Sequence, residues 1–305
     1  MHCTNTIMDF YSMDTTIPIT EIITRRFSCR TYINKPIPKE KRILIEEFIS
    51  GNKMGPFNTT SRFQLIAADA EDHKALKGLG TYGFIRGASG FIIGCTVKNS
   101  EYNLENYGYL MEKIILIATS IGLGTCWLGG SFNKSTFSQK VSTKQNEFVP
   151  AVAAIGHIAS KRRLFDKIVR WSAKATKRRH WSKLYFHETF DNALIPEIIG
   201  SFSVPLDMLR LAPSASNRQP WRIIKTKDRN VFHFFLQRTK DYYERNKKMF
   251  KMADLQRVDM GIAMCHFDLT CKELGIEGKW IVEDPRIENL PALTKYLVTW
   301  VEITK

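Results

Sequence analysis

The chain has 305 residues, 44% of them hydrophobic, which is enough to bury a core and predicts about two domains. No run of about 18 apolar residues occurs, so we expect no membrane-spanning helix. The first 18 residues lack the pattern of a secretion signal, and none of the six cysteines forms a Cys-x-x-Cys pair. We therefore expect a cytoplasmic protein with reduced thiols.

The first half alternates helical and strand-like patterns after an expected N-terminal extension at residues 1–18. Predicted helices cover 19–24, 39–49 and 106–121, and predicted strands cover 63–68, 91–96 and 148–158. The pattern over 106–121 is apolar nearly all round, which is typical of a helix buried in the core. Gly122 follows it directly, and glycine is the common residue just beyond a helix end.

A strongly basic segment links the two halves. Residues 160–183 hold ten lysines and arginines against one acid, which accounts for much of the net charge of +15. We expect an amphipathic linker helix over 161–190. A solvated helix face is the simplest interpretation, and contact with nucleic acid, acidic lipid or a phosphorylated small molecule stays open.

The second half continues with the same kinds of element. Short helices are predicted over 192–200 and 205–211, strands over 221–225, 231–236, 280–283 and 296–303, and a long helix over 254–274. The expected domains are therefore a first half at 19–160, the linker at 161–190 and a second half at 191–305.

The two long helices carry one spacing pattern. Gly108, Gly122 and Trp127 recur 153 positions later as Gly261, Gly275 and Trp280. In each half a proline-started polar loop and an aromatic residue precede a strand and then the long helix. Coincidence between two ordinary helix–glycine–strand transitions is the alternative. The matching order favours two copies of one α+β unit, which would pack as an internal pseudo-dimer.

The halves differ in the polar residues they carry. The first opens with Arg25-Arg26-Phe27-Ser28-Cys29-Arg30, whereas the matching stretch at 187–195 has no arginine. The second has Pro213-Ser214-Ala215-Ser216-Asn217, where the first has Pro-Phe-Asn-Thr-Thr. Each half thus keeps one complementary part, which predicts one complete site.

The residue types of these parts suit an anionic, planar ligand. The arginines and Ser28 can bind a phosphate, because a guanidinium group binds it bidentately and a hydroxyl adds a further donor. Small side chains and the carboxamide of Asn217 can approach the polar edge of a ring system. The alternatives are a basic surface cluster for the arginines and an ordinary capped turn for the 213–217 segment.

Two further segments are candidates for ligand contact. Leu128-Gly129-Gly130 follows Trp127, and its glycines would let a ligand approach the backbone, although a tight turn explains them equally well. Arg162 and Arg163 follow the strand that ends near residue 158 and could add phosphate contacts. His157 and His180 are isolated from other ligand residues, so we expect no metal site and no metal cofactor.

Three segments resemble nitroreductase-family proteins. Residues 26–32 resemble their RRSxRxY/F segment, 213–221 their PSxxNxQPW segment and 121–129 their lGLGTcWlg segment. The fused variant, in which one chain carries two nitroreductase-like halves, fits best over about residues 19–303. Gly55-Pro56-Phe57 and residues 178–181 also resemble that subgroup, which usually has proline where His180 stands. Phe27 also departs from the pattern, which makes the alignment of Arg25 against Arg26 uncertain by one position.

The resemblance implies an α+β nitroreductase-like fold, with two similar halves whose central sheets are flanked by helices and which form an intramolecular pseudo-dimer. It also implies FMN held at the seam between the halves. The residues implied to contact FMN are Arg25, Arg26, Phe27, Ser28, Arg30, Leu128, Gly129, Gly130, Arg162, Arg163, Pro213, Ser214 and Asn217.

The implied chemistry is hydride transfer from NAD(P)H to FMN N5, followed by electron transfer to a nitroaromatic, a quinone or a similar acceptor. The cofactor carries that chemistry, so the resemblance names no catalytic side chain. A non-catalytic flavin binder and a basic nucleic-acid-binding protein are the alternatives. We expect NAD(P)H and a small acceptor as partners, no nucleic acid and no membrane, and the fused architecture is compatible with a monomer.

Overall fold

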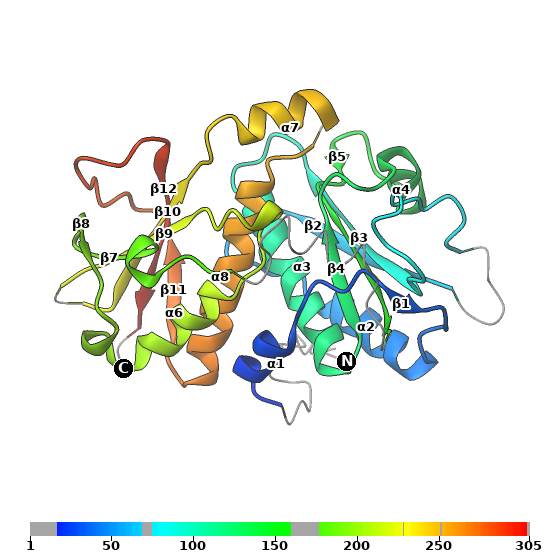
Figure 1. The fold of residues 1–305 in the computed structure, drawn as a ribbon, viewed down its shortest axis with the longest axis horizontal. Coiled ribbons are helices and arrows are strands. Elements are labelled where there is room, and N and C mark those ends of the chain that lie inside the picture. The colour runs from blue at the N-terminus through cyan, green and yellow to red at the C-terminus, as the bar shows by residue number, and fades with distance from the viewer. Residues whose placement is uncertain (1–16, 69–74, 160–176, 228, 251, 304–305) are drawn as a thin grey trace, which may run out of the picture. The chain divides into compact units, whose positions relative to one another are not determined.

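The computed structural model describes residues 17–68, 75–159, 177–227, 229–250 and 252–303 (Figure 1). The chain divides into two compact units, residues 1–169 and 170–305. Of the expected N-terminal extension, residues 1–16 lie outside the described residues, as do residue 160 and residues 161–176 of the expected basic linker. None of the described helices is long and apolar enough to cross a membrane.

The first unit is an α+β unit built on one sheet. Its elements are α1 (Ile19–Arg25), β1 (Tyr32–Ile33), α2 (Lys39–Gly51), β2 (Ser61–Ala67), β3 (Gly90–Val97), α3 (Asn103–Ser120), β4 (Gly124–Leu128), α4 (Lys134–Lys140), β5 (Glu147–Phe148) and β6 (Val152–Ile158). The long strands follow the order β2-β3-β6-β4, and every neighbouring pair is antiparallel. β1 pairs with the end of β6, and β5 pairs with the end of β3.

Helix α3 is the core helix of this unit, as the sequence predicts. It contacts β2, β3 and β4 as well as α1 and α2. Its residues from Ile114 to Ala118 are completely buried. The helix ends before Gly122, whose φ of +78° is the left-handed conformation that glycine adopts without steric penalty.

The second unit repeats this plan with additions at one sheet edge. Its elements are η2 (Trp181–Lys183), β7 (Tyr185–His187), β8 (Thr189–Ala193), η3 (Pro196–Ile198), η4 (Gly200–Phe202), α6 (Ser203–Arg210), η5 (Ala215–Asn217), β9 (Trp221–Lys225), β10 (Val231–Gln237), α7 (Tyr242–Phe250), α8 (Leu255–Glu273), β11 (Gly278–Ile281) and β12 (Thr294–Glu302). The strand order is β11-β12-β10-β9-β7-β8. All neighbouring strands are antiparallel except β7 and β9, which are parallel.

The two units share a strand order as well as a spacing pattern. The path β2-β3-β6-β4 in the first unit corresponds to β9-β10-β12-β11 in the second. Gly275 follows α8 with a φ of +70°, as Gly122 follows α3. Trp127 lies in β4 and Trp280 in β11, so the repeated residues occupy equivalent elements. The structure therefore contains two similar α+β halves.

Two expectations for the start of the second half are wrong. Residues 192–200 are not one helix, because β8 extends to Ala193 and is followed by two short 3₁₀ turns. Pro196 and Gly200, with a φ of +62°, interrupt any continuous helix there. In the described part of the linker, Tyr185–His187 form a strand instead of a helix, because they pair with β9 and bury Tyr185.

Candidate functional site

The arginine-rich segment lies beside β4 in the first unit. It follows α1, and Ser28 forms an isolated parallel bridge with Thr125. The backbone N–H of Cys29 donates to the carbonyl of Thr125 at 2.8 Å, and the Tyr32 hydroxyl donates to the carbonyl of Cys29 at 2.6 Å. The fold thus brings Ser28 alongside the strand that leads into Gly129 and Gly130.

Arg26 is engaged by a buried carboxylate. Its Nε lies 3.6 Å from Glu112 Oε1, and the two side chains are 6% and 0% exposed. Trp127 Nε1 donates to the other oxygen, Glu112 Oε2, at 2.7 Å. Arg26 therefore ties the segment to α3 and β4 from within the fold.

The other two arginines of the segment differ in exposure. Arg25 is exposed and pairs with Glu21, one turn earlier on α1. Arg30 is half-buried, and so is Ser28. Among these residues, Arg25 is therefore the one whose side chain is clearly exposed to solvent.

Leu128 and Phe27 belong to the hydrophobic core of this unit. Leu128 is buried in a cluster that includes Phe132 and Phe137, and Phe27 packs against that cluster. Gly129 and Gly130 come directly after β4 and are half-buried. The 128–130 segment therefore has backbone groups, and not the Leu128 side chain, to offer to a ligand.

The 213–221 segment of the second unit is a tight, internally bonded loop. Ser216, Asn217 and Gln219 have φ values of +50°, +53° and +51°, which are strained for residues with a side chain. Gln219 N–H donates to Ser214 Oγ at 2.9 Å, and Asn217 Nδ2 donates to the carbonyl of Lys177 at 2.8 Å. Such strain persists only where surrounding contacts fix the backbone.

Asp259 of α8 holds this loop in place through a hydrogen bond to its backbone. Its Oδ1 accepts a hydrogen bond from the backbone N–H of Ala215 at 2.9 Å. The side chain is buried, and Oδ2 has no hydrogen-bond partner among the residues that the structure describes. Burial raises the pKa of the Asp259 carboxyl well above its usual range, and the nearby Asp254 raises it further.

Comparison with known proteins identifies the family. A family model described as "Putative TM nitroreductase" matches residues 18–271. The chain belongs to this nitroreductase family. No curated protein sequence matches the chain.

A solved structure shows the same fold over nearly the whole chain. A protein from Thermotoga maritima MSB8, described as a "putative nitroreductase", is 19% identical, with 94% of each chain covered and a TM-score of 0.58. An FMN-dependent nitroreductase from Clostridium difficile R20291 is 19% identical, covers 47% of this chain and 88% of its own, and has a TM-score of 0.38. The Thermotoga likeness shows that the nitroreductase fold extends over both units.

Within this nitroreductase fold, the structure brings together only part of the expected site. The 25–30 and 128–130 segments are neighbours in the first unit, and 213–217 forms one loop of the second. Arg162 and Arg163 lie outside the described residues.

The described residues contain no cluster of His, Cys, Asp and Glu that could hold a metal ion. His157 contacts the carbonyl of Pro36 at 3.2 Å, and His180 contacts Ser182 Oγ at 2.8 Å, both consistent with structural roles. Burial raises the pKa of Cys95 and of Cys271, which favours the neutral thiol over the nucleophilic thiolate.

The sequence patterns do not reveal that two buried carboxyl groups, those of Glu112 and Asp259, hold the two segments. Glu112 and Asp259 each stand next to a methionine in a long, largely buried helix, and a carboxylate in such a helix is normally paired when it is buried. That signal was present in the sequence, but it does not reveal the partner.

Proposed function

We propose that this protein is an FMN-dependent oxidoreductase that takes hydride from NAD(P)H and reduces a small acceptor such as a nitroaromatic or a quinone. When bound, FMN supplies the hydride and electron chemistry, so the protein has to bind and orient it. The observation that carries the proposal is the pairing of Ser28 with Thr125 in a nitroreductase fold. It sets Ser28 and Arg30 beside the strand that leads to Gly129 and Gly130.

The residues of this region suit the phosphate end of FMN. Arg25 and Arg30 supply guanidinium groups, and Ser28 supplies a hydroxyl donor from a half-buried position. Arg26 is held by Glu112, so we assign it to positioning the segment. Phe27, packed against the core cluster, fixes the backbone between the donors. Arg162 and Arg163 remain proposed phosphate contacts.

The remaining candidates suit the ring end of FMN. Gly129 and Gly130 have no side chain to block a planar ligand, so their N–H groups are the proposed donors to the ring. Leu128 contributes only backbone, since its side chain is buried in the core. From the second unit, Pro213, Ser214 and Asn217 are proposed to add contacts, which is supported by the complementary motifs of the two halves.

The loop geometry sets a condition on the role of Asn217. Its Nδ2 donates to Lys177 O, and its Oδ1 accepts from Arg178 Nη1 at 3.4 Å and from Gln219 Nε2 at 3.3 Å. An Nδ2 group carries two hydrogens, and the carbonyl of Lys177 accepts one of them. Its strained φ is consistent with a residue held in place for binding.

Asn217→Ala tests this assignment. We expect FMN affinity to fall about 10-fold, because one or two hydrogen bonds are lost, while the fold remains intact. Flavin released from the purified protein and an FMN titration give the measurement, and circular dichroism checks the fold. Asn192→Ala is the matched control, since Asn192 is exposed and its Nδ2 donates to Thr189 Oγ1 at 3.3 Å, away from every residue assigned to FMN in the described part of the chain. Equal FMN affinity in the two variants would remove Asn217 from the site.

A further inference from the structure

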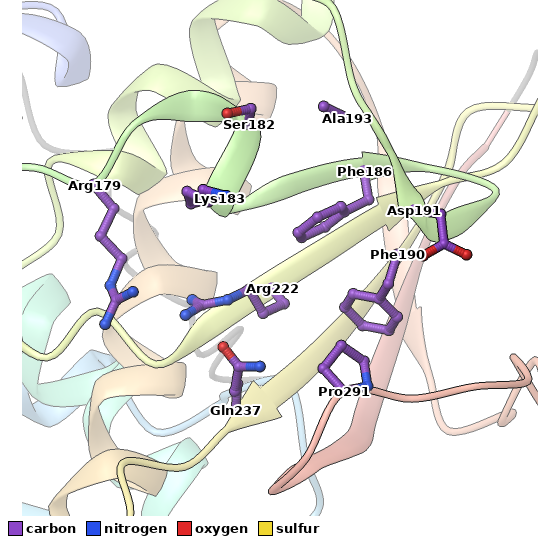
Figure 2. A pocket seen from close by; sticks show the side chains of 10 residues that line it. All are labelled: Arg179, Ser182, Lys183, Phe186, Phe190, Asp191, Ala193, Arg222, Gln237 and Pro291. Carbon is purple, nitrogen blue, oxygen red and sulfur yellow. The ribbon is translucent and has the colours of Figure 1, made fainter.

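A pocket of about 480 Å³ opens on the sheet of the second unit, where residues of β7, β8 and β9 line it (Figure 2). Pockets of this size typically hold small molecules. Arg179, Lys183 and Arg222 line one end, and Phe186, Phe190 and Pro291 line the other. The pocket therefore combines a cationic end with an apolar end.

Arg222 on β9 is the buried cation of this pocket. The residue is only 5% exposed. Its Nη1 donates to the carbonyl of Gln219 at 3.0 Å and to that of Trp221. No acidic side chain pairs with it in the part of the chain that the structure describes, although buried arginines are almost always paired.

A second guanidinium group stands next to it. Figure 2 shows the side chain of Arg179 extending toward that of Arg222. Burial, together with the positive charge of Arg179, lowers the pKa of Arg222 to about 10. Two neighbouring cations without a carboxylate between them repel each other, and a bound anion would relieve that repulsion.

The polar groups around Arg222 and Arg179 do not neutralise this cationic end of the pocket. The backbone N–H of Arg179 donates to Gln219 Oε1 at 2.8 Å, and its carbonyl accepts from Arg210 Nε at 3.0 Å, so its main chain is fixed. Asp191 also lines the pocket, but its carboxylate points away from the two arginines (Figure 2). Gln237 uses its Nε2 to donate to Thr294 Oγ1 at 3.2 Å.

The apolar end offers aromatic surface. The rings of Phe186 and Phe190 have centroids 5.1 Å apart at an interplanar angle of 56°, and Phe190 also packs edge-on against Phe235 at 5.2 Å. Phe186, Phe190 and Pro291 are each half-buried and line the pocket. Flat apolar ligands pack well on aromatic side chains arranged in this way.

We propose that this pocket binds an organic anion, with its carboxylate or phosphate held by Arg222 and Arg179 and its flat apolar body packed against Phe186 and Phe190. The pocket lies entirely within the second unit, and none of the residues assigned to FMN lines it. It is a second ligand site beyond the proposed oxidoreductase function.

Calorimetric titration of the full chain with four probes tests the proposal. 1-Naphthyl phosphate and 1-naphthoate carry both the ring and the anion, 1-naphthol lacks the anion, and inorganic phosphate lacks the ring. We expect the two naphthyl anions to bind, the stronger of them identifying the preferred group. Both partial probes should bind at least about 10-fold more weakly, since each loses one set of contacts.

Variants place the binding in this pocket. Arg222→Gln and Arg179→Gln should each weaken naphthyl anion binding about 10-fold or more. Arg229→Gln is the matched control, because it removes one positive charge from an exposed position outside the pocket. Arg179 is exposed, so its variant keeps the test decisive if Arg222→Gln does not fold.

The same titrations can overturn the proposal. Absent binding of the naphthyl anions, equal binding of either partial probe, or equal weakening by Arg229→Gln would each contradict it. Saturating FMN should leave the affinity unchanged, and competition by FMN would assign the pocket to the flavin. A protein that retains no FMN but binds the naphthyl anions would refute the oxidoreductase proposal alone.

Discussion

The two units place a tryptophan at the same point of the repeat and surround it differently. In the first unit, Trp127 donates to buried Glu112, which also holds Arg26. In the second, Trp280 packs edge-on against Phe234, with ring centroids 5.0 Å apart, and its Nε1 has no hydrogen-bond partner within the described ranges of the chain. The position equivalent to Glu112, 153 residues later, is Cys265.

This difference shows that equivalent positions of the two halves carry different interactions. In the first unit a buried carboxylate connects α3 and β4 to the arginine-rich segment, so a polar network in the core positions a candidate binding segment. In the second unit the same place belongs to an aromatic core, in which Phe267 of α8 packs on Phe232 and Trp300. The polar anchor there is Asp259, which holds the 213–217 loop instead.

The largest expected effect comes from removing Glu112. Glu112→Ala leaves the nearly buried Arg26 without its carboxylate, and losing one partner of a buried ion pair typically lowers the free energy of unfolding by about 3–5 kcal/mol. Cys265→Ala at the equivalent position removes one sulfur atom from an apolar core and should lower it by only about 1 kcal/mol. Urea denaturation gives both values, and equal losses would contradict the contrast.

A pH-dependent effect is expected at Asp259. Because burial raises its pKa in the folded state, the protonated carboxyl stabilises the fold, and this contribution is lost as pH rises from the unfolded pKa toward the folded one. Asn keeps an acceptor for Ala215 N–H but does not titrate.

Relative to wild type, Asp259→Asn should therefore gain unfolding free energy as pH rises above about 4, with a slope of at most about 1.4 kcal/mol per pH unit. Urea denaturation at a series of pH values measures it. A difference between the two proteins that does not change with pH would show that Asp259 titrates normally.

The smallest effects are expected at the paired glycines. A Cβ added to Gly122 or to Gly275 meets no atom within 4 Å, so the penalty of Gly122→Ala or Gly275→Ala is the strain of a positive φ alone. Each substitution should lower the free energy of unfolding by about 1 kcal/mol. Similar losses of unfolding free energy, measured by urea denaturation, would support the equivalence of the two helix ends. A much larger loss in one unit would contradict it.

Much of the fold could be predicted from periodicity. The core helices, Gly122 and the strand Trp221–Lys225 follow directly from apolar patterns and turn residues. The strand β7 could not be found in this way, because it is three residues long and is defined by its pairing with β9. The surrounding basic residues favour a helix in sequence, but strand pairing and burial of Tyr185 decide its conformation.

The sequence predicts which segments form the candidate site, but it does not predict the contacts that their side chains make. The spacing of the motifs indicates the segments Arg25–Arg30 and Pro213–Asn217. It does not distinguish among the three arginines of the first segment. Only tertiary structure separates Arg26, which a buried carboxylate engages, from exposed Arg25. The Arg222 pocket could not be predicted either, because a single arginine that follows Trp221 in a strand is expected to face solvent.

The absorbance spectrum of the purified chain, recorded anaerobically before and after NADH or NADPH, tests the central claim most directly. We expect a yellow protein whose flavin absorbance is bleached by at least one of the two nucleotides and returns when a nitroaromatic or quinone is added. A colourless protein that takes up no added FMN, or bound flavin that neither nucleotide reduces, would contradict it.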